Sequence, residues 1–200
     1  MKFIDIIFIR HGEKKRDDAN FHNIELTDKG LEQARLSGKK LLSFNITSLY
    51  TSDMVRAVQT AEEINRELKL PLVIKPELQE IDMGVFNTGW NANAEKYKDF
   101  ITVFEKHEKD MAYPDGESGK NVWYRTRNFT EKISCEDGNT LIVSHGGTIR
   151  CILCGLLGIP FEKRFLLGEP IHNCGISVIR HNTDTRKYSL QLFNDNSHLL

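Results

Sequence analysis

Two histidines each stand before glycine at the end of an apolar segment. His11 precedes Gly12, and His145 precedes Gly146 and Gly147. A neutral imidazole can attack phosphorus, and a second imidazole can bind the oxygens of the transferred group. Glycine lets the backbone turn tightly and leaves room for a ligand. A lone histidine after a strand is more often a hydrogen-bonded structural residue, but the repeated arrangement predicts one shared anion site.

Two arginines are placed to meet these histidines. Arg10 adjoins the first of them, and Arg56 falls in the first turn of a predicted helix that follows another strand. A planar guanidinium can hold two oxygens of one phosphoryl group. The helix expected from Gly147 would direct amide donors at the same anion. We predict a phosphate-binding site of Arg10, Arg56, His145 and Gly146 that contains no metal.

Cleavage of a phosphate ester also needs a proton for the departing alkoxide, and two acidic residues are candidates. Glu80 or Asp82 could supply this proton and later accept one from the attacking water. The alternative for Glu80 is a solvated loop carboxylate. Asp82 begins an Asp-x-Gly sequence, which often forms a turn. We therefore expect Glu80 to be the proton donor and Asp82 to serve the turn.

Alternating strands and helices must carry these residues. Strands are expected at 3–9, 46–51, 72–75, 140–144, 175–180 and 188–193, and helices after Thr27, after Ser52 or Asp53, at about 118–134 and at 147–157. This order predicts an α/β fold, a three-layer sandwich with a mostly parallel central sheet. In such folds the ligand site lies beyond the carboxyl ends of the strands.

The organisation of the chain points to one domain, residues 1–200. The irregular segment of about 76–120, rich in proline and glycine, is expected to form a small loop and helix insertion over the active site. The formal net charge of −1 argues against a general nucleic-acid or membrane-surface binder. No apolar run is long enough to cross a membrane, and the first residues are expected to form a buried strand rather than a signal peptide.

Cysteine usage indicates a reduced, cytoplasmic protein. Four cysteines in 200 residues do not suggest a disulfide framework. Cys151 and Cys154 have a redox or metal spacing, but they lie in an apolar helix and are expected to be buried thiols. The chain offers no Asp-x-His or His-x-His cluster of metal-ligand type. We expect no metal and no cofactor, and the sequence does not predict the oligomeric state.

The motifs together resemble the histidine phosphatase superfamily, also called the phosphoglycerate-mutase-like family. The segments that carry the resemblance run in family order over nearly the whole chain: Arg10-His11-Gly12-Glu13, Leu26-Thr27, Gly30, Gln33-Ala34, Ser52, Arg56-Ala57, Gln59-Thr60-Ala61, Glu80-Ile81-Asp82-Met83-Gly84, Gly116-Glu117-Ser118, Ser144-His145-Gly146-Gly147 with Arg150, and Asn196-Ser197-His198-Leu199. The resemblance implies that His11 is phosphorylated, that Glu80 donates the proton, and that His145 completes the phosphate site.

The expected function is hydrolysis of a small phosphomonoester through a phosphohistidine on His11. Mutase relatives usually have a longer loop after the first motif, whereas here Leu26 is reached in fewer residues, and no extended tail follows His198. Both features favour a phosphatase over the alternative, mutase-type phosphoryl transfer. A non-catalytic phosphate-binding scaffold and a metallophosphatase are further alternatives. The expected partner is a small phosphorylated substrate.

Several further residues have two interpretations each. Lys14, with Lys15 and Arg16, could recognise a second anionic group or form a solvated basic loop. The aromatic residues of the insertion could line the site or only pack together: Tyr97, Phe100, Phe104 and Tyr113. Asn173 could support the site, and His198 is expected to dock the tail near the sheet. The remaining histidines in polar segments are expected to be solvated: His22, His107 and His181.

Overall fold

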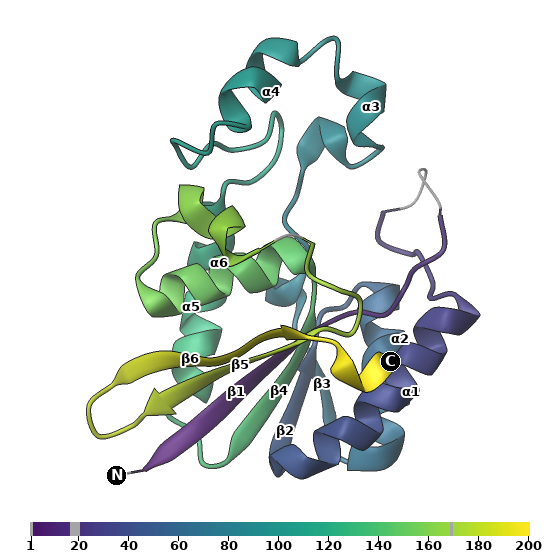
Figure 1. Cartoon of the computed structure of the whole chain (residues 1–200), viewed down its shortest axis with the longest axis vertical. Coiled ribbons are helices and arrows are strands. Elements are labelled where there is room, and N and C mark those ends of the chain that lie inside the picture. The colour runs from purple at the N-terminus through teal and green to yellow at the C-terminus, as the bar shows by residue number, and fades with distance from the viewer. Residues whose placement is uncertain (1, 17–20, 169) are drawn as a thin grey trace.

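A six-stranded sheet forms the centre of the computed structural model, which describes residues 2–16, 21–168 and 170–200 (Figure 1). Its order is β3-β2-β4-β1-β5-β6. The strands are β1 (Phe3–Arg10), β2 (Ile46–Thr51), β3 (Leu72–Ile74), β4 (Asn139–Ser144), β5 (Ile176–Asn182) and β6 (Lys187–Asp195). The neighbours β3, β2, β4 and β1 pair in parallel, and only β5 runs against the others. The predicted mostly parallel sheet is confirmed.

Helices cover both faces of the sheet because the central strand is apolar on both sides. Ile7 and Ile9 pack beneath α1 (Asp28–Leu41) and α2 (Val55–Leu68). Ile6 and Phe8 pack beneath α5 (Gly119–Ile133) and α6 (Gly146–Leu157) on the other face. Full burial of each such side chain contributes roughly 1.5–3 kcal/mol. The three predicted layers are therefore present, and β1 lies at their centre.

Two of the helices begin at the residues that the sequence indicates. The side chain of Thr27 accepts a hydrogen bond from the amide of Gly30 at the start of α1. Ser118 and Asn121 form a capping box at the start of α5. Such a cap stabilises a helix by about 1 kcal/mol. These caps fix where the two helices enter the fold.

The start predicted for α2 is wrong. Ser52 and Asp53 precede the helix, but the helix begins at Val55, and no side chain caps it. The hydroxyl of Ser52 instead accepts a hydrogen bond from the amide of Met54 at 3.2 Å and also contacts His145. Ser52 is therefore held beside the second histidine rather than at the helix terminus.

The insertion forms a cap at the carboxyl end of the sheet (Figure 1). It contains the 3-10 turns Pro76–Leu78 and Gly84–Phe86 and the short helices α3 (Trp90–Asn93) and α4 (Lys98–Phe104). Phe86, Phe104 and Tyr113 form its small core, which also contacts α5 and α6 through Val122 and Cys151. This apolar contact fixes the cap against the rest of the protein.

Two histidines that were expected to be solvated are in fact packed. His181 is buried, and its Nδ1–H donates to the carbonyl of Ser134 at 2.8 Å. His107 stacks on Phe165 with ring centroids 4.1 Å apart. Their partners lie far away in the sequence, so the polar residues beside them concealed the packing. His22 is exposed, as expected.

The final residues and the cysteines lie where the sequence predicts. After the 3-10 segment Phe161–Leu167 and the strands β5 and β6, the turn Ser197–Leu199 packs against α1, where His198 hydrogen-bonds the hydroxyl of Ser37 at 2.9 Å. Cys151 and Cys154 are buried thiols. Burial raises the pKa of Cys151 to about 12. Among the described residues, no helix combines the length and the apolar character needed to span a membrane.

Candidate active site

Three adjacent strands end at the site. His11 follows β1, His145 follows β4 and Ser52 follows β2. The sheet order places β4 between β2 and β1. Arg10 lies opposite Ser144 in the parallel register, so the two loops that carry the histidines meet at the same edge. The ring centroids of His11 and His145 are 5.1 Å apart.

Hydrogen bonds fix the tautomer of His11. Arg56 donates from Nε to Nε2 of His11 at 3.2 Å. Because a guanidinium can only donate, Nε2 must carry a lone pair, and the proton is on Nδ1. Nδ1–H donates to the carbonyl of Gly12 at 2.7 Å. Asn173 donates to the main-chain carbonyl of His11 at 2.9 Å and so fixes the backbone of this loop.

The environment keeps the ring of His11 neutral. Burial lowers the pKa of His11 well below its ordinary value, and the positive charges of Arg10 and Arg56 lower it further. The side chain is 2% exposed. A neutral ring with an unprotonated Nε2 is the form of histidine that can act as a nucleophile.

Arg10, which is half-buried, and Arg56, which is buried, bring two positive charges to the site, and the carboxylate of Glu80 acts on both without forming an ion pair. Arg10 donates to the carbonyl of Ile171, and Arg56 donates to the carbonyl of Phe21 at 2.8 Å. Neither guanidinium forms an ion pair within the part of the chain that the structure describes. Burial lowers the pKa of Arg56 to about 10, so it stays charged at neutral pH. These charges make the site attractive to anions.

His145 and Arg10 each leave a buried nitrogen without a hydrogen bond. Nε2 of His145 lies 3.0 Å from the hydroxyl of Ser52, but its Nδ1 has no partner among residues 2–16, 21–168 and 170–200. The same is true of Nε of Arg10. Burial lowers the pKa of His145 well below its ordinary value, and His11 and Arg56 add to this shift. Buried polar atoms without a partner are rare and costly, and here they mark where a ligand oxygen could bind.

Glu80 points into the same site from the loop after β3, which rules out the solvated alternative. Its Oε1 accepts hydrogen bonds from the amide of Ile81 at 2.9 Å and from the amide of Thr148 at 3.1 Å. Glu80 is half-buried. A Cβ on Gly147 would lie 2.8 Å from Oε1 of Glu80, so glycine is needed there for the carboxylate to reach α6.

A bidentate ion pair that the sequence did not predict fixes the backbone around Glu80. Arg125 bonds both carboxylate oxygens of Glu117, at 2.8 and 2.9 Å. Arg125 also donates to the carbonyls of Glu77, Gln79 and Glu80. Glu117 Oε2 accepts from the amide of Asp82 at 3.0 Å. Glu117 belonged to a recognised motif, but nothing local in the sequence marked Arg125.

The glycines act mainly through close packing rather than through tight turns. None of Gly12, Gly146 and Gly147 has a positive φ angle, so their backbone conformation does not itself require glycine. A Cβ on Gly12 would lie 2.5 Å from the carbonyl oxygen of Gly30. At Gly146 a Cβ would make ordinary contact with Cδ of Arg10, at 3.7 Å.

Asp82 and the basic loop lie at the periphery. Asp82 Oδ1 accepts from the amide of Gly84 at 2.8 Å and from the side chain of Asn87 at 2.6 Å, so the structure places it in a turn. Lys15 pairs with Glu25 on the surface at 2.6 Å. Arg16 is exposed, whereas Lys14 lines the cavity.

A cavity of about 330 Å³ opens above His11 between the cap and the first loop. Besides the charged side chains and Asn87, its lining contains five apolar side chains: Phe21, Ile24, Met83, Phe86 and Trp90. Of the four cap aromatics named from the sequence, none lines this cavity. Arg150 borders the site on the other side of Glu80, with Gly146 and Ile171.

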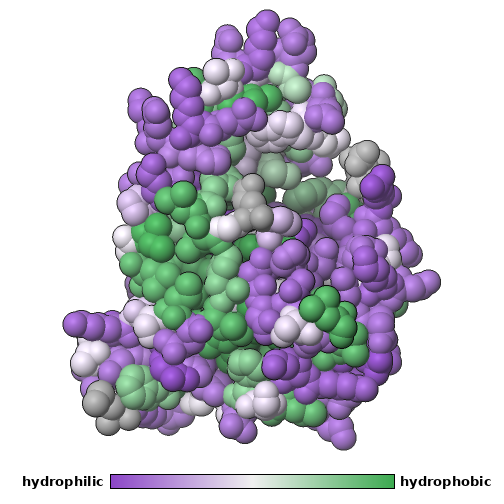
Figure 2. Space-filling model, in the orientation of Figure 1, coloured by the Kyte–Doolittle hydropathy of each residue, from purple (hydrophilic) through white to green (hydrophobic). Residues whose placement is uncertain are grey.

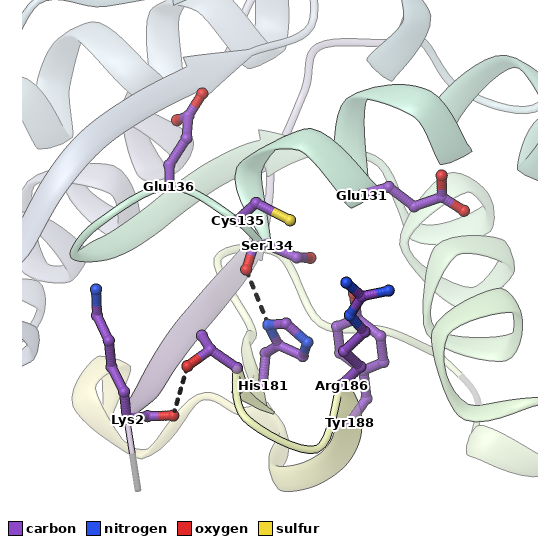
Figure 3. Close-up of a pocket in the computed structure, with 9 residues that line it drawn as sticks. Lys2, Glu131, Ser134, Cys135, Glu136, His181, Arg186 and Tyr188 are labelled. Carbon is purple, nitrogen blue, oxygen red and sulfur yellow. Dashed lines mark hydrogen bonds between the residues drawn. The ribbon is translucent and has the colours of Figure 1, made fainter.

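A larger cavity, of about 640 Å³, lies at the opposite end of the sheet (Figure 3). Its described lining does not bring two histidines and two arginines together, as the candidate site does. His181 lies in its wall and donates to Ser134, as the dashed line shows (Figure 3). Lys2, which also lines this cavity, forms an ion pair with Asp137. Across the described residues, no group of three or more histidine, cysteine, aspartate or glutamate side chains could hold a metal ion.

Comparison with known proteins gives consistent matches. The family model described as the histidine phosphatase superfamily (branch 1) matches residues 6–196. Phosphoserine phosphatase 1 of Hydrogenobacter thermophilus is 27% identical over 196 residues, 94% of this chain and 92% of that protein. "Probable phosphoglycerate mutase GpmB" of Yersinia enterocolitica is 31% identical over 193 residues, 88% of this chain and 84% of that protein.

A solved structure with this fold is mycobacterial glucosyl-3-phosphoglycerate phosphatase in complex with inorganic phosphate. The two chains are 20% identical, and the TM-score is 0.86. The alignment covers 98% of this chain and 99% of the mycobacterial chain. At this identity the similarity establishes the fold, and the alignment extends across the cap as well as the sheet.

Proposed function

The chain belongs to the histidine phosphatase superfamily, branch 1, and on that premise we propose that it hydrolyses a small phosphomonoester through a phosphoryl group carried on His11. The observation that carries this proposal is the buried, neutral His11 in a site with two buried nitrogens without partners, Nδ1 of His145 and Nε of Arg10. A phosphoryl group on Nε2 would bring oxygen acceptors to these nitrogens, and Nδ1 of His145 donates when the Ser52 hydroxyl donates to its Nε2. Superfamily members are phosphatases or mutases.

In the first step, Nε2 of His11 attacks phosphorus, and the bond from phosphorus to the ester oxygen breaks. The departing oxygen takes a proton from Glu80. Arg10, Arg56 and His145 hold the phosphoryl oxygens, whose charge is the main quantity to be stabilised in phosphoryl transfer. The proton on Nδ1 of His11 remains in its bond to the carbonyl of Gly12, which stabilises the ring as it gains positive character.

In the second step, a water molecule attacks phosphorus from the side that the alcohol has left. Glu80, now ionised, accepts one proton of the water, and the bond from phosphorus to Nε2 breaks. Inorganic phosphate leaves, and both Glu80 and His11 return to their starting states. The amides of Ile81 and Thr148 hold the Glu80 carboxylate in place for both transfers.

The test is to stop the enzyme with base during turnover of a phosphorus-32-labelled ester and to map the label by peptide analysis. Acid-labile, base-stable phosphate on His11 is the expected result. Rapid turnover without label on any histidine, or undiminished turnover by His11→Ala, would refute the proposal. The matched control is His22→Ala, because His22 is an exposed histidine on the same loop.

Transfer to water rather than to a second hydroxyl is the finer part of the proposal. The short first loop supports it. None of the described residues lining the cavity belongs to the segment Ser197–Leu199, which packs on α1. Partitioning of the labelled enzyme between water and 3-phosphoglycerate tests this point. Phosphate release that added phosphoglycerate does not reduce supports hydrolysis, whereas formation of bisphosphoglycerate would favour a mutase.

A further inference from the structure

The cavity above His11 has two chemically different parts. One part of its lining is polar and cationic, with Arg10, Lys14, Arg56 and Glu80. The other part is bounded mainly by apolar side chains from two separate segments. Phe21 and Ile24 come from the first loop, where the Phe21 ring lies 5.1 Å from the guanidinium of Arg56, and Met83, Phe86 and Trp90 come from the cap. This face of the molecule is hollowed between the cap and the body, and hydrophobic residues are visible within the hollow (Figure 2).

The cap wall is a rigid aromatic surface. Trp90 stacks on Phe86 with centroids 4.5 Å apart and an interplanar angle of 27°. Phe86 is 1% exposed and also stacks on Phe100. Trp90 meets Tyr113 edge-on at 6.5 Å. Because these rings support one another, Trp90 is held at the cavity without needing a ligand to order it.

The polar group nearest to this wall is already partly used within the protein. Asn87 lines the cavity, but its Nδ2 donates to Asp82 at 2.6 Å, and its Oδ1 accepts from the amide of Met83 at 3.1 Å. These two bonds use one of the two N–H donors and one of the two lone pairs of the amide, so a hydroxyl group that enters the apolar part would give up water for at most the remaining sites of Asn87. Burial of a polar group without a hydrogen bond is unfavourable.

From this asymmetry we infer that the substrate is the phosphate ester of a flat, apolar alcohol, such as an aromatic or unsaturated ring on a short alkyl arm. The inference rests on the proposed function, because it assumes that the phosphoryl group lies at His11. The leaving group then extends from His11 toward Trp90 and lies between Trp90 and Phe21. Polyol phosphates are disfavoured because their hydroxyl groups would face these rings. Phosphoserine is disfavoured because its ammonium group would face them, although its carboxylate could reach Lys14.

The test compares esters whose scissile bonds are alike. 2-Phenylethyl phosphate and glycerol 3-phosphate are both esters of primary alcohols, so a difference in kcat/KM reports recognition of the leaving group. We expect 2-phenylethyl phosphate to be preferred by about tenfold or more, since a single methylene in an apolar site already contributes about tenfold. Phosphoserine is the third substrate. Equal or better turnover of glycerol 3-phosphate or phosphoserine would overturn the inference.

Variants of residues in the cavity wall test which side chains set the preference for 2-phenylethyl phosphate. Trp90→Ala is expected to reduce the ratio of the two kcat/KM values toward one, and Trp90→Phe is expected to retain most of it. Phe21→Leu, on the opposite wall and outside the cap core, provides a second measurement if Trp90→Ala does not fold. The matched control is Tyr124→Ala, which truncates a half-exposed aromatic residue on α5. An unchanged ratio in both Trp90→Ala and Phe21→Leu would contradict the assignment.

Failure of this inference can be distinguished from failure of the proposed function. If His11 becomes labelled but glycerol 3-phosphate is the better substrate, the enzyme is a histidine phosphatase whose leaving-group preference lies elsewhere. If no ester is hydrolysed and no label appears on His11, the proposed function itself is wrong.

Discussion

The two ends of the sheet each contain a buried histidine in the wall of a cavity, but they handle charge differently. At the amino end, His181 donates to Ser134 and stacks on Tyr188, and Lys2 is paired with Asp137. At the carboxyl end, Arg10 and Arg56 donate to carbonyls, and Nε of Arg10 and Nδ1 of His145 are buried without a partner among the residues described. The cavity at the amino end is the larger of the two.

This difference indicates that converging positive charges mark a site better than cavity size does. Burial of a guanidinium is unfavourable, and it lowers the pKa of Arg10 and of Arg56 although the charge of Glu80 acts in the opposite direction. A protein that keeps two such cations together stabilises a ligand of opposite charge when it binds. At the amino end, Lys2 is paired with Asp137 and Arg186 is exposed to solvent, so among the described residues two buried guanidinium groups do not converge there.

The largest contrast is expected between two histidine variants. His11→Asn should reduce kcat by on the order of 10⁴-fold or more, the scale expected when a nucleophile is lost. His181→Asn, at the other end of the same sheet, should leave kcat within about twofold, the small effect expected of a substitution outside the active site. Steady-state kinetics on one ester measures both, with circular dichroism to establish folding. Comparable losses in the two variants would mean that the comparison of the two ends is wrong.

The sequence predicted the strand ends well because their signals are local. An apolar strand, a histidine and a glycine are consecutive at both His11 and His145, and the parallel sheet then brings the two loops together. Arg125 could not be predicted in this way. Its partners at Glu77, Gln79 and Glu80 lie 45 to 48 residues earlier in the chain. Trp90 was missed for a similar reason, since only the folded cap turns it toward the cavity.

Two arginine variants test the same difference between the two ends of the sheet. Arg56→Lys keeps the positive charge but loses the Nε–H that contacts His11 and the planar fork that can hold two oxygens. We expect kcat/KM to fall by about 10²-fold. Arg186→Lys changes an exposed arginine in the wall of the other cavity and should leave kcat/KM unaltered. Full activity of Arg56→Lys would show that charge alone, without geometry, is sufficient.

The ion pair between Arg125 and Glu117 should affect catalysis through the proton transfer by Glu80. Glu80→Gln should slow esters of poor leaving groups by about 10²-fold, because those esters need the proton, and should slow activated aryl esters much less. Arg125→Lys should show the same pattern at about tenfold, because it loosens the backbone that carries Glu80. A merely structural role would slow both ester classes equally.

The matched control for Arg125 is Arg127→Lys, an exposed arginine two residues along the same helix. This variant makes the same change from arginine to lysine, but Arg127 contacts none of the carbonyls around Glu80. Equal slowing of poor and activated esters by Glu80→Gln would reassign the proton donor, with Asp82 as the next candidate. A change in leaving-group dependence in Arg127→Lys would show that the pattern is not specific to the ion pair.

The smallest expected effect is on stability, and it follows from the neutral histidines. The folded-state pKa values of His11 and His145 are lowered, so below about pH 6.5 the unfolded chain binds protons that the folded protein does not. Stability is therefore fully present above pH 6.5 and is lost as the pH falls. Lowering the pH to 5.5 should cost on the order of 1 kcal/mol for each histidine.

Urea unfolding at pH 7.5, 6.5 and 5.5 measures this loss, and the comparison of variants assigns it. The half-exposed His198, whose pKa burial also lowers, contributes in the same direction and stays in every variant. His11→Gln should remove about half of the loss that His11 and His145 cause together, because the replacement cannot gain a proton on unfolding. If His11→Gln keeps the whole pH dependence of the native protein, the ring of His11 is not held neutral by the fold, and the site lacks the prepared nucleophile that distinguishes it from the opposite end of the sheet.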